Sequence, residues 1–159
     1  MVRSYLLVGI LAALSQSAHG AVFNDGIKSK VGDSLLPLLH DVEDATTVSF
    51  GESSDASVQV WKFDTEGQAT PDDAIITPSN SAKALVCREG SYCSLSLEGE
   101  RQPYRVIRVE KEDPIFTFQD LATGLYVSRS DDLHLELTET QSEKIYFLLD
   151  KTVAQHEEI

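Results

Sequence analysis

The sequence feature that most constrains the fold is a pattern that recurs at a spacing of 40 residues. Residues 115–149 contain four short apolar runs separated by turn residues, and residues 75–109 contain matching runs in the same order. The matched positions include Ile115 with Ile75, Leu125 with Leu85, Leu135 with Leu95, and Tyr146 with Val106. A supersecondary unit repeated at a fixed period constrains the architecture more strongly than local propensity does.

Within these runs, apolar and polar residues alternate. Phe116 and Phe118 are separated by one polar residue, and so are Leu133, Leu135 and Leu137. A period of two is typical of β-strands with one buried face. No stretch has a helical period with capping residues at its ends, so the sequence predicts an all-β chain of about ten to twelve short strands.

A third copy is predicted N-terminal to the other two. Leu35–Leu39, Thr46–Phe50 and Ser57–Phe63 take the places of its first, second and third strands, and a poor fourth strand lies near Gln68–Asp73. A β-trefoil consists of three copies of a four-stranded unit, so this pattern predicts a β-trefoil. In that fold the first and fourth strands of each copy build a six-stranded barrel, and the second and third form a capping hairpin. We expect an N-terminal arm at 21–33, one β-trefoil domain at 34–151 and an acidic tail at 152–159.

Residues 1–20 have the organisation of a secretory signal peptide. Arg3 precedes an apolar run from Tyr5 to Leu14, and small residues at Ala18 and Gly20 precede Ala21. The run is too short to span a bilayer, which takes about 20 apolar residues. We therefore expect cleavage before Ala21 and a secreted, extracellular protein with no membrane insertion.

The net negative charge of the chain limits the classes of partner that it can bind. Removal of residues 1–20 leaves 139 of the 159 residues, and the loss of Arg3 takes the formal net charge from −13 to −14. Nucleic acids and anionic membranes bind through cationic contacts, so a scattered acidic surface excludes both. We expect a monomer without a cofactor.

The two cysteines, Cys87 and Cys93, flank five residues with Gly90 in the middle. Export brings the chain into an oxidising compartment, so we expect a disulfide across a hairpin. No second cysteine pair or nearby histidine completes a tetrahedral metal site, and the spacing is longer than the Cys-x-x-Cys of redox proteins.

Two short motifs resemble ricin-B-type lectin domains. Ser57–Asp64 followed by Gly67 and Gln68 is similar to the first repeat of these domains, and Thr123–Ser128 resembles the glycine-led second strand of their small secreted fungal members. The resemblance covers the mature chain loosely and these motifs specifically. It implies a β-trefoil that binds carbohydrate without catalysis, in shallow pockets where an aromatic ring stacks on the sugar and an acid and an amide hold its hydroxyls.

On this resemblance the first repeat holds the candidate carbohydrate site. Trp61 takes the stacking position and Gln68 the amide position, while Ser49 stands where the acidic residue usually lies, with Asp64 or Asp55 as a substitute. The corresponding acid and aromatic positions in the other repeats look degenerate: they are Cys87, Glu98, Ser128 and Thr138. A core position for Trp61 is the alternative interpretation.

Catalysis is not expected. His134 lies on the polar face of an alternating strand, beside Asp132 and Glu136, which predicts an exposed side chain. The sequence contains no Gly-x-Ser-x-Gly, phosphate-binding loop or dinucleotide fingerprint. The competing function is that of a protease inhibitor or secreted effector that binds a protein through its loops, for example Arg88–Tyr92 stiffened by the disulfide.

Overall fold

Twelve strands and two short 3-10 turns make up the regular structure of the residues that the computed structural model describes, which are 21–40, 46–96, 99–111 and 113–152. The first copy comprises β1 (Val22–Val31), β2 (Ser34–His40), β3 (Val48–Phe50), η1 (Ala56–Val58) and β4 (Val60–Asp64). The second comprises β5 (Asp73–Pro78), β6 (Leu85–Val86), β7 (Ser94–Leu95) and β8 (Pro103–Arg108). The third comprises β9 (Ile115–Asp120), β10 (Tyr126–Arg129), β11 (Leu135–Thr138), η2 (Glu143–Ile145) and β12 (Phe147–Asp150).

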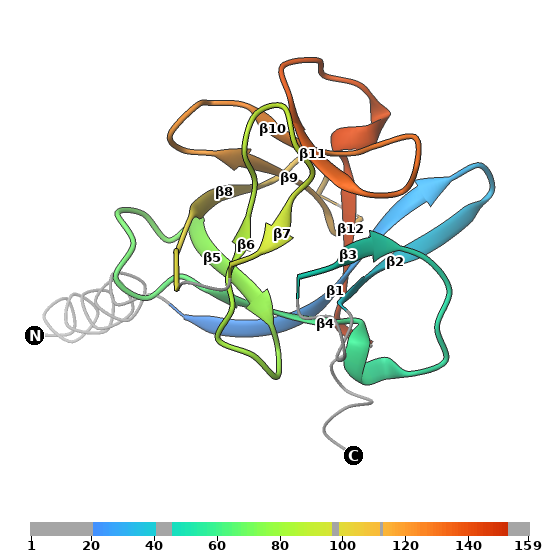
Figure 1. The fold of residues 1–159 in the computed structure, drawn as a ribbon, viewed down its shortest axis with the longest axis horizontal. Helices are drawn as coiled ribbons and strands as arrows, with labels where there is room; N and C mark the ends of the chain where they lie inside the picture. Colours follow the sequence, from blue (N-terminus) through green and yellow to red (C-terminus); the bar gives the residue numbers. More distant parts are fainter. Residues whose placement is uncertain (1–20, 41–45, 97–98, 112, 153–159) are drawn as a thin grey trace, which may run out of the picture.

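Six strands close a barrel. Antiparallel pairing runs from β1 to β4, β5, β8, β9 and β12, and β12 pairs with β1 to complete the circle. The second and third strands of each copy form the hairpins β2–β3, β6–β7 and β10–β11. Figure 1 shows the chain passing from β1 in blue to β12 in red, which returns to lie beside β1. This arrangement confirms the predicted β-trefoil.

The 40-residue spacing is confirmed for the second and third copies. Ile75 and Ile115 lie in the first strands of their copies, and Leu95 and Leu135 lie in the third strands. Both leucines are buried, as the alternation predicts.

In the first copy, however, the predicted assignment was wrong by one strand. The expected loose arm at 21–33 contains β1, which pairs with β2, β4 and β12. The segment 35–39 therefore supplies the second strand, 46–50 the third, and 57–63 the fourth. The alternation in β1 was hidden because two of its buried side chains, Asp25 and Ser29, are polar, whereas only Ile27 between them is apolar.

The trefoil domain accordingly begins at β1 rather than at residue 34. The predicted signal peptide at 1–20 and the tail from 153 onward lie outside the described residues.

Aromatic rings from two copies meet in the core. Phe147 stacks on Phe118 with ring centroids 5.2 Å apart and on Phe50 at 6.0 Å, and Phe63 lies 6.0 Å from Phe118. All four are 3% exposed or less. Large rings bury the most apolar area per residue, so this cluster joins β3, β4, β9 and β12 into one core.

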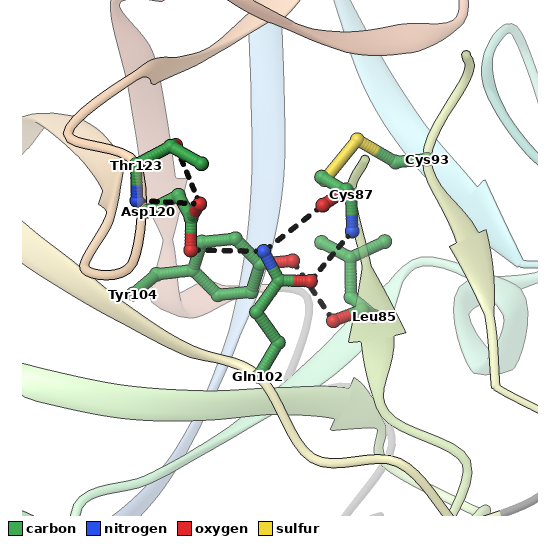
Figure 2. The surroundings of a disulfide bond; sticks show 7 residues. All are labelled: Leu85, Cys87, Cys93, Gln102, Tyr104, Asp120 and Thr123. Atoms are coloured by element: carbon green, nitrogen blue, oxygen red, sulfur yellow. Dashed lines mark hydrogen bonds between the residues drawn. A yellow bond between two sulfur atoms is a disulfide. The ribbon is translucent and has the colours of Figure 1, made fainter. Parts of the chain in front are cut away.

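The predicted disulfide between Cys87 and Cys93 is confirmed, and it joins the ends of β6 and β7. Figure 2 shows the Gln102 amide between the backbone of Cys87 and the carboxylate of Asp120. Gln102 Oε1 accepts from Cys87 N at 2.8 Å, while Nε2 donates to Cys87 O at 3.0 Å and to Asp120 Oδ1 at 2.9 Å.

Asp120 receives further hydrogen bonds in the same cluster. Burial raises the pKa of this carboxyl, but hydrogen bonds from the Thr123 hydroxyl and the Gln102 amide outweigh burial and hold the pKa below its ordinary value. Gln102 and Asp120 therefore link the second hairpin to the third copy through fully hydrogen-bonded polar groups.

Candidate functional site

Trp61 lies in the core and not on the surface. It belongs to β4, between β1 and β5 in the barrel, and is 0% exposed. Its Nε1–H donates to Leu38 O at 2.9 Å, and the ring of His40 meets it edge-on at 5.0 Å. A buried ring offers no face to a sugar, so the prediction of Trp61 as the stacking residue was wrong and its alternative as a core tryptophan was right.

The other candidates of the first copy do not surround Trp61. Asp64 accepts from Glu66 N at 2.9 Å and Gln68 N donates to Thr65 O at 3.3 Å, so both belong to the turn after β4. Ser49, in β3, lines a hollow of about 240 Å³ to which neither contributes.

Asp55, the remaining substitute, accepts from Ser57 N at 2.9 Å and caps η1. The side-chain and backbone hydrogen bonds from Ser57 hold the pKa of Asp55 below its ordinary value. Its local role is therefore that of a turn-capping residue.

The disulfide turn, residues 88–92, is exposed at the surface and is flanked by the bonded Cys87 and Cys93. Ser91 N donates to Arg88 O at 3.2 Å, and Gly90 has φ +87°, which closes residues 88–91 into a tight turn. Arg88 pairs with Glu100 at 2.6 Å. Tyr92 donates to the Asp132 carboxylate and stacks on His134 at 4.5 Å, which fixes this turn to the third copy.

A larger groove lies at the meeting of the first and third copies. Its volume is about 750 Å³, within the range of small-ligand sites. It is lined by Lys28, Lys30, Gly32, Leu35, Val109, Glu110, Asp113, Ile115, Arg129, Glu143, Tyr146 and Leu148. We call this the β1–β12 groove.

Strand pairing explains why several of these residues share one surface. In β1, Lys30 is opposite Leu35 of β2, and Lys28 is opposite Leu148 of β12. Leu148 is in turn opposite Ile115 of β9. Cross-strand partners point to the same side of a sheet, so a band of apolar and cationic side chains crosses four strands.

Tyr146 gives the groove an accessible aromatic ring. It precedes β12 by one residue, lies two residues before Leu148, and is 42% exposed. Val109 and Leu35, at 44% and 52%, are exposed apolar neighbours in the same lining. A half-exposed ring beside apolar side chains and charged groups suits a ligand with both an apolar face and a polar rim.

Arg129 is the most buried charged group in the lining. It is 8% exposed, its Nε donates to Ser29 Oγ at 3.1 Å, and its Nη1 donates to Ser130 O at 3.3 Å. Within the described part of the chain, no carboxylate lies within 4.0 Å of its guanidinium nitrogens. Lys28, by contrast, pairs with Asp150 at 2.6 Å.

Sequence reasoning missed this groove. The alternation of Lys28 and Lys30 indicates a charged strand face, and the exposed position of Tyr146 follows from its alternation with Ile145 and Phe147, which are both buried. The approach of Arg129 to Ser29, 100 residues away, leaves no local signal in the sequence.

Solved structures share this fold. A ricin B-like lectin from Macrolepiota procera in complex with lactose has a TM-score of 0.64 at 14% identity, with 80% of this chain and 94% of that chain covered. SeviL bound to asialo-GM1 saccharide has a TM-score of 0.63 at 14% identity, with 81% and 97% covered. The designed three-fold symmetric protein ThreeFoil has a TM-score of 0.60 at 15% identity, with 80% of this chain and 97% of that chain covered.

These likenesses agree with the β-trefoil fold that the strand pairing shows. No protein-family model matches its sequence, and no curated protein matches it either. The described residues contain no helix long and apolar enough to cross a membrane. Nor does any group of three or more histidine, cysteine, aspartate or glutamate side chains gather in metal-binding proximity among them.

Proposed function

We propose that the protein is a secreted carbohydrate-binding protein without catalytic activity, and that it binds glycans in the β1–β12 groove. The observation that carries this proposal is the half-exposed ring of Tyr146 in a groove of about 750 Å³ whose lining mixes apolar and charged side chains. A sugar has an apolar face that stacks on such a ring and hydroxyls that carboxylates and cations hold.

The fold gives this proposal general support. Two of the proteins that share the fold were solved with a saccharide bound, although their identity of 14% extends the likeness to the fold alone. Backbone pairing between β1 and β12 places Lys28 opposite Leu148, which fixes the relative positions of these two groove residues.

A glycan array followed by calorimetric titration of the best ligand tests the proposal. We expect Tyr146→Ala to weaken glycan binding by about fivefold, because stacking on a ring contributes on the order of 1 kcal/mol. Tyr92→Ala is the matched control, since Tyr92 is 48% exposed but lies outside the groove. An array without any bound glycan, or equal losses in the two variants, would refute the proposed site.

Secretion has its own test. Residues 1–20 carry the charge, apolar run and small residues of a signal peptide, and a disulfide joins Cys87 to Cys93. Expression of the full chain in a secreting host should release a protein whose N-terminal residue, by sequencing, is Ala21. Retention of Met1 in the exported product would contradict the cleavage site.

A further inference from the structure

We infer that the β1–β12 groove selects glycans that carry an acidic group, a carboxylate or a sulfate, and that Arg129 receives this group. This inference rests on the proposed carbohydrate-binding function. It adds a ligand class that the fold likeness does not supply, because the saccharide-bound relatives named above were solved with lactose and asialo-GM1 saccharide.

The guanidinium of Arg129 is a buried charge in the groove lining. The residue is 8% exposed, and no carboxylate of the described residues lies within 4.0 Å of its guanidinium nitrogens. The acidic residue two positions along the chain, Asp131, forms its ion pair with Lys144 and acts on Arg129 only as a charge more than 4.0 Å away. A buried charge is costly unless an opposite charge and hydrogen bonds compensate it.

The guanidinium of Arg129 also has N–H groups that donate to none of the described residues. Arginine has five N–H donors in a planar fork, and the described residues accept from Nε and Nη1 alone, through Ser29 Oγ and Ser130 O. Neither acceptor is charged. The fork geometry matches the paired oxygens of a carboxylate or sulfate, which accept two parallel hydrogen bonds.

A second cation lies along the same lining. Lys30 is exposed, forms no ion pair with a described carboxylate, and lies on the groove side of β1 opposite Leu35. Its position two residues from Lys28 gives both lysines the same side of β1. Because Lys28 is paired with Asp150, the cation that this strand adds beside an anionic group at Arg129 is Lys30.

The three acidic residues of the lining do not cancel this selectivity. Glu110, Asp113 and Glu143 are all exposed to solvent, which screens them, whereas the charge of Arg129 is buried. Exposed carboxylates can accept hydrogen bonds from sugar hydroxyls, and they favour an orientation with the anion turned toward Arg129. Three basic and three acidic residues balance in this lining, whereas the whole chain carries a net charge of −13.

Titration with matched glycan pairs tests the inference. The pairs are a sialylated oligosaccharide with its asialo counterpart and a sulfated oligosaccharide with its unsulfated counterpart, which also separates carboxylate from sulfate. We expect at least one acidic member to bind about tenfold or more tightly than its neutral partner, as a charge-assisted hydrogen-bond pair provides. Poly-glutamate, added as competitor, should not displace it.

Three variants assign the effect to residues. Arg129→Gln and Lys30→Gln should lower the acidic preference while binding of the neutral glycan persists, and Lys83→Gln, which removes a lysine outside the groove, should leave the preference unchanged. Lys30 is exposed, so its variant remains informative if Arg129→Gln fails to fold.

Each outcome has a distinct meaning. Three outcomes would overturn the acidic selectivity and leave the proposed function standing. They are equal binding of neutral and acidic glycans, displacement by poly-glutamate, and equal effects of Lys30→Gln and Lys83→Gln. An absence of binding to every glycan would overturn both.

Discussion

Asp25 offers the sharpest test of the energetics of this barrel. Its side chain is 2% exposed in β1, and its Oδ1 atom has no hydrogen-bond partner among the described residues. Burial, offset by Lys151 and reinforced by Asp150, raises the pKa of Asp25 from 3.8 to about 6. We therefore expect Asp25→Asn, which removes the charge while retaining the shape, to stabilise the protein at neutral pH.

The sign and size follow from proton linkage. Because the folded-state pKa lies above the unfolded one, the folded state holds the proton more tightly, and stability falls as pH rises from 3.8 through about 6. A difference of about two between the unfolded and folded pKa values of Asp25 lowers the free energy of unfolding by at most about 3 kcal/mol, since a pKa difference of one corresponds to about 1.4 kcal/mol. Relaxation around a buried carboxylate reduces this, so we expect Asn to gain about 1–3 kcal/mol at pH 7.5 and close to nothing at pH 4.

Urea unfolding of the parent and Asp25→Asn at pH 4, 5, 6 and 7.5 measures this dependence. Asp33→Asn, an exposed carboxylate in the β1–β2 turn, is the control for a general loss of negative charge. The reasoning is refuted if Asp25→Asn gains as much at pH 4 as at pH 7.5, or if it destabilises the protein at pH 7.5.

Three further variants test two polar contacts and the disulfide by urea unfolding at pH 7, with a second measurement at pH 4 for the first of them. Gln102→Glu places a second carboxylate against Asp120 and removes the donor to Cys87 O. We expect the free energy of unfolding to fall by about 2–4 kcal/mol at pH 7 and by less at pH 4. A loss independent of pH would contradict the electrostatic reason. Asp73→Asn removes the charge of the buried partner of Arg105, 2.9 Å away, and should lower the urea midpoint only slightly, because that arginine is half-exposed. An unchanged midpoint would mean that the pair is fully screened. Replacing both Cys87 and Cys93 by Ala opens a short loop, with an expected loss of about 2 kcal/mol, and an unchanged midpoint would show that the turn is held without the bond.

Much of the fold could be predicted because a trefoil repeats its strands at a fixed spacing. Ile75 and Ile115, and Leu95 and Leu135, occupy equivalent strands as their 40-residue separation indicated. In the first copy the register failed, because the inward side chains Asp25 and Ser29 removed the apolar alternation from β1. One missed strand shifted every later strand of that copy by one position.

The same one-strand error explains why the predicted carbohydrate site was wrong. Trp61 was expected on an exposed hairpin strand, but its strand is the fourth of the copy, which the barrel places between β1 and β5. Trp61 and Phe63 lie two residues apart in β4, and both are buried. Alternation identifies residues that share a face, and it carries no information on what covers that face.

By itself, the sequence determined the repeat, the all-β class, the trefoil arithmetic and the disulfide between Cys87 and Cys93, because each depends on spacing along the chain. Only the tertiary structure decided which residues surround a ligand-sized space. The β1–β12 groove joins Lys30, Tyr146 and Arg129 through barrel closure between β1 and β12. Closure pairs the first strand with the last, so the contacts that define the groove span about a hundred residues, beyond the reach of any local pattern.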